Sequence, residues 1–312
     1  MTQPPVLSFS ALRDGEPQAL AALSDACECY GLFLLKDHGI DGTLAAGAFT
    51  AAADFFARPL PEKNQVRRSA ENPWGFYDAE LTKNTRDWKE IFDVGPPIDR
   101  WVPRWPQQPV AFRPQIDGLA QACYDLSLEL LDALAALLSV PSQRLRAGFA
   151  PSHTSFLRIN RYPRCAEPAN PEGLQAPAAG HLGVNHHTDS GALTILLQDG
   201  HAALEFWHAG AWHSVPAPAD AVVVNLGDIV QVWSNDRFHA PVHRVRASAR
   251  QERMSMPFFL NPANSYRYAP VTDADAPRYR AIAWQEFREQ RAAGDYADYG
   301  AEVQIADYRI AP

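Results

Sequence analysis

The segment His187-Thr188-Asp189 carries the strongest chemical signal in the chain, and His243 follows it much further on. Alternate side chains of an extended strand share a face, so His187 and Asp189 can point into one cavity. Two imidazoles and one carboxylate on one face of a metal ion leave three coordination positions open. This arrangement suits an ion that binds a chelating co-substrate and then dioxygen, as in non-haem iron(II) oxygenases. A structural zinc site would instead fill all four positions with protein ligands.

A histidine two residues before an aspartate is a weak pattern on its own, because the chain has 10 histidines. Three others compete for a place in the site: His181, His186 and His239. The histidine next to His187 would face the opposite side of the strand. Pro241 opposes a helical pair of ligands made by His239 and His243. Strand alternation therefore favours His187, whereas the choice of His243 depends mainly on the sequence around it.

A second group of polar residues could hold a dicarboxylate. Arg253 and Ser255 share one strand face, where a guanidinium can bind a carboxylate through two hydrogen bonds and a hydroxyl adds a donor. On the separate run LRINRYP, Asn160 and Tyr162 also share a face. Any one of these residues alone is more commonly a surface arginine or a core tyrosine. Together with the metal-binding pattern they indicate a dicarboxylate site beside an iron.

The elements that must position these residues fall into two parts of the chain. Helices are expected over 16–30, 42–58 and 117–140, the last of them a long buried spine, and another after residue 277. Between them, strands are expected at LFLLKD and around 88–94. After residue 151 short β-rich runs are separated by turn residues: TSFLRINRYP, GALTILLQD, LEFWHAGAWHSVP, AVVVNLGDIVQVWS, PVHRVRAS and RMSMPFFLN. This spacing predicts a β-sandwich or barrel.

Composition limits the classes of partner. The 312-residue chain has a net charge of −8 and no block of lysine or arginine, so we expect no binding to nucleic acid or to an anionic membrane surface. No signal peptide is recognisable, and no stretch approaches the ~20 apolar residues of a membrane span. The four cysteines are too few and too scattered for a disulfide framework. We expect a cytoplasmic protein, and the sequence leaves its oligomeric state open.

These motifs resemble the isopenicillin N synthase-like family of 2-oxoglutarate/Fe(II)-dependent oxygenases over nearly the whole chain. HTDSGALTILLQD resembles the first-ligand motif, SNDRFHAPVHRV the second-histidine segment and RMSMPFFLNP the co-substrate motif. The resemblance implies a mainly β fold with flanking helices, a distorted double-stranded β-helix (jelly roll) core and a long spine helix. It implies four regions: an N-terminal mixed α/β region at 1–115, the spine helix at 116–145, the jelly-roll catalytic core at 150–265, and a C-terminal helix and tail at 266–312.

The resemblance also implies a role for each residue of the site. His187, Asp189 and His243 would be the catalytic Fe(II) ligands. The 2-oxoglutarate co-substrate would be bound by four residues, the first two at its far carboxylate: Arg253, Ser255, Tyr162 and Asn160. The implied reaction uses O2, with ascorbate as an accessory reductant, and releases succinate and CO2. It would hydroxylate, desaturate or cyclise a small, largely apolar molecule of secondary metabolism.

The substrate pocket is expected to draw on four aromatic residues, although each is more commonly an ordinary core residue: Trp74, Phe76, Tyr77 and Phe258. The Ala/Pro-rich stretch at 165–180 is longer than in typical members of the family. Because it directly precedes the first metal ligand, we expect it to form part of a substrate lid.

Rival functions remain open from the sequence. An iron oxidase of the isopenicillin N synthase or aminocyclopropane oxidase type would have a similar site but no need of 2-oxoglutarate. Asn160 beside Tyr162 favours a 2-oxoglutarate user, and succinate release would discriminate the two. A zinc hydrolase or metal sensor is a rival of another class, but it gives no role to Arg253 and Ser255 after a facial triad. A metal-free scaffold would require the triad to be accidental.

Overall fold

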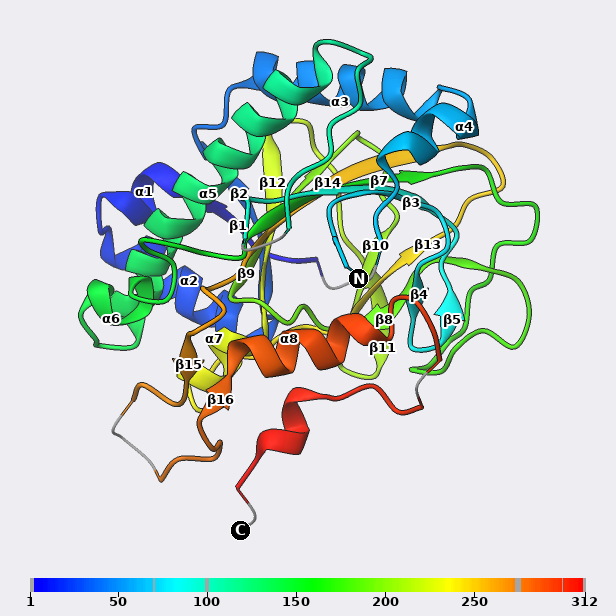
Figure 1. The fold of residues 1–312 in the computed structure, drawn as a ribbon. Coiled ribbons are helices and arrows are strands. Elements are labelled where there is room, and N and C mark those ends of the chain that lie inside the picture. The colour runs from blue at the N-terminus through cyan, green and yellow to red at the C-terminus, as the bar shows by residue number, and fades with distance from the viewer. Residues whose placement is uncertain (1–2, 70, 99–100, 273–275, 299, 311–312) are drawn as a thin grey trace.

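The computed structural model describes residues 3–69, 71–98, 101–272, 276–298 and 300–310. Two β-sheets lie at its centre, and helices cover the outer face of the larger one (Figure 1). The predicted mainly β fold with flanking helices is confirmed. Among the described residues, no helix combines the length and the apolar character that a bilayer crossing needs.

The two sheets contain most of the strands in the described part of the chain. The larger sheet has eight strands in the order β1 (Val6–Ser8), β2 (Leu32–Lys36), β12 (Ala221–Leu226), β9 (Leu193–Gln198), β14 (Arg253–Leu260), β7 (Phe156–Tyr162), β6 (Glu90–Val94) and β3 (Gly75–Tyr77). The smaller sheet has four, in the order β11 (Ala211–Ser214), β10 (Leu204–His208), β13 (His243–Arg246) and β8 (Leu182–His187). Two short ladders pair β4 (Leu81–Thr82) with β5 (Thr85–Arg86) and β15 (Arg267–Tyr268) with β16 (Ile282–Ala283).

Helices account for most of the remaining regular structure. They are α1 (Phe9–Arg13), α2 (Pro17–Cys29), α3 (Gly42–Phe56), α4 (Leu60–Lys63), α5 (Phe112–Leu137), α6 (Ser142–Arg146), α7 (Asp228–Trp233) and α8 (Trp284–Ala293), with 3-10 turns at Asn64–Val66 and Ile305–Tyr308. The start of α3 is fixed by Asp41, whose carboxylate accepts a hydrogen bond from the Leu44 N–H.

Two helices differ from the sequence-based expectation. The spine helix α5 begins at Phe112 rather than at 117. The run after β12, DIVQVW, was expected to be strand but forms α7. All but one of its residues are buried, so it lacks the one-sided apolar pattern that identifies a surface helix, and its valines and isoleucine suggest a strand. Asp228 in the first turn favours the helix, because a negative charge there complements the helix dipole.

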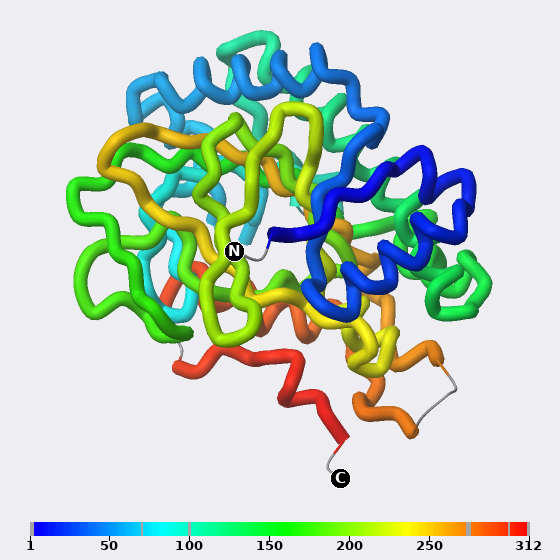
Figure 2. Tube along the Cα trace, turned by 180° about the vertical axis from the view of Figure 1, so that it is seen from behind, coloured from blue at the N-terminus to red at the C-terminus, as the bar shows by residue number. Residues whose placement is uncertain are grey.

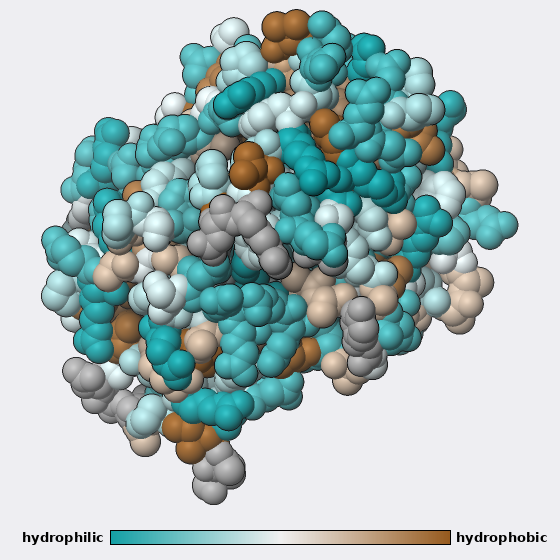
Figure 3. Space-filling model, viewed as in Figure 1, coloured by the Kyte–Doolittle hydropathy of each residue, from teal (hydrophilic) through white to brown (hydrophobic). Residues whose placement is uncertain are grey.

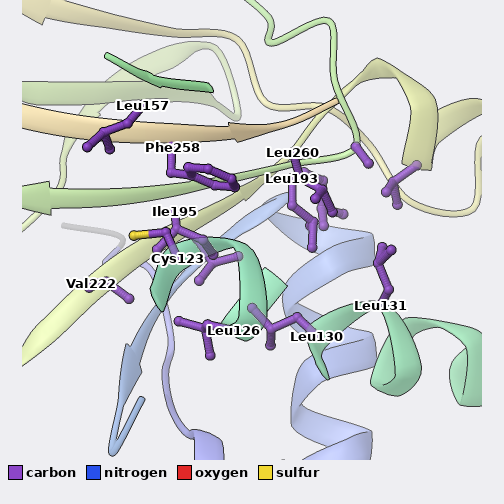
Figure 4. Packing of buried hydrophobic residues seen from close by; sticks show 14 of the residues in the cluster. Cys123, Leu126, Leu130, Leu131, Leu157, Leu193, Ile195, Val222, Phe258 and Leu260 are labelled. Carbon is purple, nitrogen blue, oxygen red and sulfur yellow. The ribbon is translucent and has the colours of Figure 1, made fainter. Parts of the chain in front are cut away.

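The main core lies between α5 and the outer face of the larger sheet. Figure 4 shows Leu126 and Leu130 of α5 facing Ile195 of β9 and Phe258 of β14. From behind, α3 and α5 lie on one side of the molecule, while the C-terminal segment runs along the edge farthest from α3 (Figure 2). The opposite face of the larger sheet is therefore left free to form a second, smaller apolar cluster with the smaller sheet.

Truncating a buried side chain of the spine helix is expected to destabilise the whole fold. Leu130 is 2% exposed, so Leu130→Ala should lower the free energy of unfolding by about 2–5 kcal/mol through lost burial and a cavity. Urea denaturation measures the change, with the exposed Gln121→Ala on the same helix as the control. A loss for Leu130→Ala no larger than that of the control would contradict a spine role for α5.

Candidate active site

Two histidines and an aspartate converge between the sheets. His187 ends β8 and His243 begins β13, and the two residues are directly paired across the antiparallel ladder. Their ring centroids lie 4.3 Å apart. Oδ1 of Asp189 lies 3.6 Å from Nε2 of His187 and 3.7 Å from Nε2 of His243. One ligand atom of each residue lies within 4.8 Å of the others, the spacing that a single metal ion requires.

Backbone carbonyls fix the orientation of both imidazoles. Nδ1 of His187 lies 2.8 Å from the carbonyl oxygen of Asn185, and Nδ1 of His243 lies 3.0 Å from that of Pro241. When Nδ1 carries the proton and donates to a carbonyl, the lone pair of Nε2 is free for a metal. Both Nε2 atoms face Asp189. The residue types and their orientation therefore fit Fe(II), with one face of the ion left for other ligands.

The carboxylate of Asp189 is held from behind by two donors. Its Oδ2 accepts hydrogen bonds from Oγ1 of Thr194 at 2.5 Å and from Nδ2 of Asn225 at 2.6 Å. These donors come from β9 and β12, adjacent strands of the larger sheet. Oδ1 is thereby turned toward the histidines, where it would offer a single oxygen to a metal ion, since donors bonded to a ligating carboxylate commonly orient it in this way.

Removing one of these donors is expected to loosen the metal site without emptying it. Thr194→Val keeps the shape of the side chain but leaves Oδ2 of Asp189 with one partner, and Fe(II) affinity should fall about 10- to 100-fold. Fe(II) titration by calorimetry measures this, and Thr194→Ser, which keeps the hydroxyl, is the matched control. Equal affinities for the valine and serine variants would argue against this positioning role.

Charge and burial keep the site in the protonation states that a metal needs. Burial, followed by the neighbouring His243, lowers the pKa of His187 to about 3, so its imidazole is neutral. Burial alone would raise the pKa of Asp189, but the neighbouring His243 and His187, together with the hydrogen bonds from Thr194 and Asn225, hold it below its ordinary value. A neutral imidazole and an ionised carboxylate are the forms that bind metal.

The backbone that carries Asp189 packs without room for an extra atom. Gly227 lies just before α7. A Cβ atom added to it would lie 2.1 Å from the carbonyl oxygen of Gly191 and 3.0 Å from that of Asp189. The Asp228 N–H also donates to the Asp189 carbonyl at 2.8 Å. Close contact between the β12–α7 turn and the segment after β8 therefore sets the depth of the carboxylate in the site.

A second set of polar groups lies beside the triad on the larger sheet. In the ladder between β14 and β7, Arg253 is paired with Tyr162 and Ser255 with Asn160, so all four side chains share one face. The tyrosine hydroxyl lies 3.5 Å from the serine Oγ, as does Nδ2 of Asn160. Both the four residues and the triad line one cavity of about 270 Å³. The structure thus brings together all seven of these predicted residues.

The guanidinium of Arg253 is held in place by hydrogen bonds, but one of its nitrogens lacks a partner in the described part of the chain. Its Nε donates to the carbonyl of His201 at 3.0 Å, its Nη2 donates to Oε1 of Gln198 at 2.9 Å, and the group lies over the Tyr162 ring at 5.0 Å. Its Nη1 is buried without a hydrogen-bond partner in the described part of the chain. A buried, fully charged donor of this kind fits a carboxylate ligand, which would supply the missing acceptor.

The expected aromatic pocket is only partly present. Trp74 lines the cavity, but Tyr77 does not, and its ring instead lies tilted against that of Tyr296, with 5.4 Å between the ring centroids. Phe76 and Phe258 belong to the main core, and Figure 4 shows Phe258 on the α5 side of the sheet. On β14 the cavity face is continued by other residues of the Arg253–Ser255 parity: Pro257 and Phe259. Strand alternation already contained this signal.

The 165–180 segment does not line the cavity. It packs on the outer side of the smaller sheet, where Arg244 donates to the carbonyl of Pro171 at 2.6 Å and to Oδ1 of Asn170 at 3.0 Å. Trp212 of β11 donates to the carbonyl of Gly173 at 3.2 Å. The expected lid role therefore has no support here, because these bonds hold the segment against the smaller sheet and none of its residues lines the cavity. Helix α8 lies at the cavity instead, and the surface over it is mostly hydrophilic (Figures 1 and 3).

One wall of the cavity is charged, which the sequence did not indicate. Arg68, Glu80, Asp93 and Arg158 form a buried network: Arg68 bonds Glu80 and Asp93, each at 2.7 Å, and Arg158 bonds the same two acids, each at 2.8 Å. Lys89 adds a bond of 2.6 Å to Glu80. All five residues line the cavity. The wall is thus polar at this end, whereas a largely apolar pocket was expected.

Three further residues that support the site were missed from the sequence: Asn225, Asp228 and Arg291. Arg291 of α8 donates to the carbonyl of Thr188 at 2.8 Å and so holds the residue between two triad members. Asp228 is fully buried, and burial raises its pKa to about 6. The only available signal was that polar residues interrupt apolar runs, as in VVVNLGD.

Folding stability is expected to depend on pH through Asp295, beside the charged wall. Burial, and then Glu80, raise its pKa to about 7 from an ordinary value of 3.8, and its side chain is 31% exposed. A raised carboxyl pKa contributes stability below pH 3.8 that is lost as pH rises through about 7. The melting temperature of Asp295→Asn minus that of wild type should therefore be larger at pH 8 than at pH 5. Asp298→Asn, at an exposed position, serves as the control; the same difference at both pH values would contradict the shift.

Comparison with known proteins identifies the family. Residues 153–262 match the model of the 2OG-Fe(II) oxygenase superfamily, and residues 4–111 match an N-terminal model described as non-haem dioxygenase in morphine synthesis. Gibberellin 20 oxidase 2 of Oryza sativa subsp. japonica is 32% identical over 302 residues, covering 90% of this chain and 74% of that protein. This chain belongs to the 2OG-Fe(II) oxygenase superfamily.

Further relatives resemble this chain in sequence or in fold. Flavanone 3-dioxygenase 2 of Oryza sativa subsp. japonica is 30% identical over 279 residues, covering 86% of this chain and 78% of that protein. The fold matches the crystal structure of JOX2 with 2OG, Fe and JA at a TM-score of 0.83 (24% identity, 100% and 90% coverage). It also matches a full-length Neurospora crassa protein crystallised with alpha-KG and thymine, at a TM-score of 0.79 (25% identity, 93% and 96% coverage).

The predictions of family, jelly-roll fold, enzyme class and cofactors are thereby confirmed. The protein is a 2-oxoglutarate- and Fe(II)-dependent dioxygenase of the isopenicillin N synthase-like kind. An iron oxidase that does without 2-oxoglutarate is not favoured. The two related crystal structures hold small molecules, namely JA and thymine.

Proposed function

We propose that His187, Asp189 and His243 hold the catalytic Fe(II), and that the enzyme oxidises a small molecule bound between this triad and the charged wall. The observation that carries the proposal is the convergence of one atom from each residue within 4.8 Å. Both imidazoles are oriented by backbone carbonyls, and the second oxygen of the aspartate is already occupied by two donors. Only the metal-facing atoms are therefore left without a fixed partner.

We assign the binding of 2-oxoglutarate to Arg253, Ser255, Tyr162 and Asn160. The buried Nη1 of Arg253 and the neighbouring hydroxyl of Ser255 supply donors for its far carboxylate. The bound Fe(II) supplies the redox chemistry by which 2-oxoglutarate and O2 yield succinate and CO2 while a substrate C–H bond is oxidised. Apolar side chains from both sheets exclude water from this part of the cavity, among them Val184, Leu196, Leu204 and Val245.

The substrate is, in our proposal, a small molecule with both an apolar part and a polar part. A cavity of about 270 Å³ fits a molecule of modest size beside the co-substrate. Trp74, Phe156 and Phe259 offer apolar contacts, while the charged wall offers hydrogen bonds. This modifies the largely apolar substrate that the sequence suggested. Hydroxylation, desaturation and ring closure all remain compatible with such a site.

We propose the following roles for the four regions of the chain. Region 150–265 carries the triad and the co-substrate residues, and 116–145 supports it as the spine. Regions 1–115 and 266–312 close the cavity, because its wall includes Arg68 and Glu80 from the first and α8 from the second. We also propose the cytoplasm as the compartment, since Cys27, Cys29, Cys123 and Cys165 are all unpaired.

An anaerobic titration of the purified protein with Fe(II) and 2-oxoglutarate tests the proposal. We expect a visible charge-transfer absorption band that needs both additions, followed by succinate release when O2 is admitted. Zn(II) in place of Fe(II) should support neither the band nor succinate release. A protein that binds Fe(II) yet releases no succinate from 2-oxoglutarate with any candidate substrate would refute the proposed function.

A further inference from the structure

One arginine of the cavity has neither an acidic partner among the described residues nor a ligand assigned above. Arg288 of α8 lines the cavity, and its Nε is buried without a hydrogen-bond partner in the described part of the chain. Its guanidinium lies over the Trp101 ring, with 4.5 Å between the guanidinium carbon and the ring centroid. No ion pair to Arg288 is found among the described residues. The adjacent acid, Glu289, is exposed and accepts a hydrogen bond from Gln285 instead.

The other arginines of the cavity are either paired with acids or already assigned to a ligand. Arg68 and Arg158 are each paired with two buried acids, and Arg291 lies near Glu302. Arg253 is bonded to the sheet and is already assigned to the co-substrate. Burial without a compensating acid also lowers the pKa of Arg288 to about 10, which leaves it charged at neutral pH. It is thus a cation that the fold positions but does not neutralise.

A second unpartnered donor lines the same cavity. Nε1 of Trp74 is buried without a partner in the described part of the chain and also lines the cavity. The segments that carry Trp74 and Trp101 are in contact. Nδ2 of Asn72, two residues before Trp74, donates to the carbonyl of Val102 at 2.9 Å, and Val102 follows Trp101, the residue over which the Arg288 guanidinium lies. Two buried donors without a protein partner among the described residues, one of them charged, are free to bond an acceptor held in the cavity.

We propose that Arg288 anchors a carboxylate of the substrate, with Trp74 as an accessory donor, so that the enzyme acts on small organic acids. This inference rests on the proposed function and adds the substrate class. A single unpaired guanidinium matches one negative charge, and its planar donors fit the two oxygens of a carboxylate. The aromatic side chains Trp74, Phe156 and Phe259 would then contact the apolar body of the acid on its way to the triad.

The stability of Arg288 variants separates this role from a structural one. A buried guanidinium without a partner lowers stability, so an aliphatic side chain of similar length should not harm the fold. We expect R288M to melt at or above the wild-type temperature. A decrease of more than about 4 °C would show that Arg288 stabilises the fold, and would overturn the proposal.

Binding of matched acids and amides provides the direct test. The enzyme, loaded with Fe(II) and 2-oxoglutarate without O2, is titrated in a calorimeter with 3-phenylpropionate, 4-phenylbutyrate and indole-3-acetate and with their primary amides. At least one acid should bind about 10-fold or more tightly than its amide, because a charge-assisted pair replaces a neutral one. R288Q should remove this preference, R288K should retain part of it, and the exposed control R267Q should leave it unchanged.

Two results would overturn the proposal: no acid of the panel preferred over its amide, or a preference that survives in R288Q. Failure of the proposed function would look different, because wild-type enzyme would then lack the absorption band with Fe(II) and 2-oxoglutarate. A wild-type enzyme that has the band but binds acids and amides equally would contradict only the role of Arg288.

Discussion

Asp189→Ala is expected to abolish the Fe(II)–2-oxoglutarate absorption band and to reduce succinate release to background. The variant removes the one anionic ligand of the proposed triad and leaves only the two imidazoles. Loss of an outer-shell partner alone weakens metal binding about 10- to 100-fold, so loss of a direct ligand should exceed that range. Anaerobic Fe(II) titration and succinate quantification measure the two effects.

His186→Asn is the matched control for this experiment. His186 is buried to a similar degree, and it adjoins a proposed ligand on the strand but bonds Asn185 rather than the triad. The His186→Asn variant should retain the absorption band and most of the activity, whereas His187→Asn should lose both. Loss of the band in the His186 variant together with its retention in the His187 variant would mean that the strand presents the wrong face, and the proposed triad would have to be abandoned.

Arg253→Met should raise the KM for 2-oxoglutarate by about 30-fold or more while Fe(II) binding stays unchanged. Truncating one partner of a buried, hydrogen-bonded charge pair costs about 2–5 kcal/mol, and 2 kcal/mol corresponds to this factor. The Nη1 of Arg253 is a buried donor without a partner in the described part of the chain, and the other nitrogens donate to His201 and Gln198. Succinate release as a function of 2-oxoglutarate concentration gives KM.

Arg161→Met controls for the general loss of an arginine from the same pair of strands. Arg161 is paired with Met254 in the β7–β14 ladder, so it lies on the face opposite the cavity, where it contacts Glu252. Its replacement should leave the KM for 2-oxoglutarate within about twofold of wild type, as expected of an exposed ion pair. Equal KM values for the two variants would remove Arg253 from the co-substrate site.

The composition of the site could be predicted from the sequence because strand alternation is a local rule. Residues two apart on a strand share a face whatever the rest of the fold does, which links Arg253 to Ser255 and Asn160 to Tyr162. The same rule, carried two and four residues further along β14, points to Pro257 and Phe259 and excludes Phe258. The expectation of Phe258 in the pocket was therefore avoidable.

The charged wall could not be predicted, because its partners are far apart in the chain. Arg68 bonds an acid 25 positions away, and Arg158 bonds one 78 positions away. Each residue alone looks like a solvated surface charge, since charged side chains are buried only when paired. The pair between Asp93 and Arg158 exists because β6 and β7 are neighbouring strands of the larger sheet and set these two residues directly opposite each other.

By itself the sequence determined the chemistry of the metal site and the β-rich character of the region around it, since ligand type and alternation are written in short segments. The tertiary structure decided the rest. The register of β8 on β13 sets His187 opposite His243. The packing of α8 at the cavity brings the unpaired Arg288 into it. Register and helix docking depend on the burial of many side chains at once, and no short segment encodes that sum.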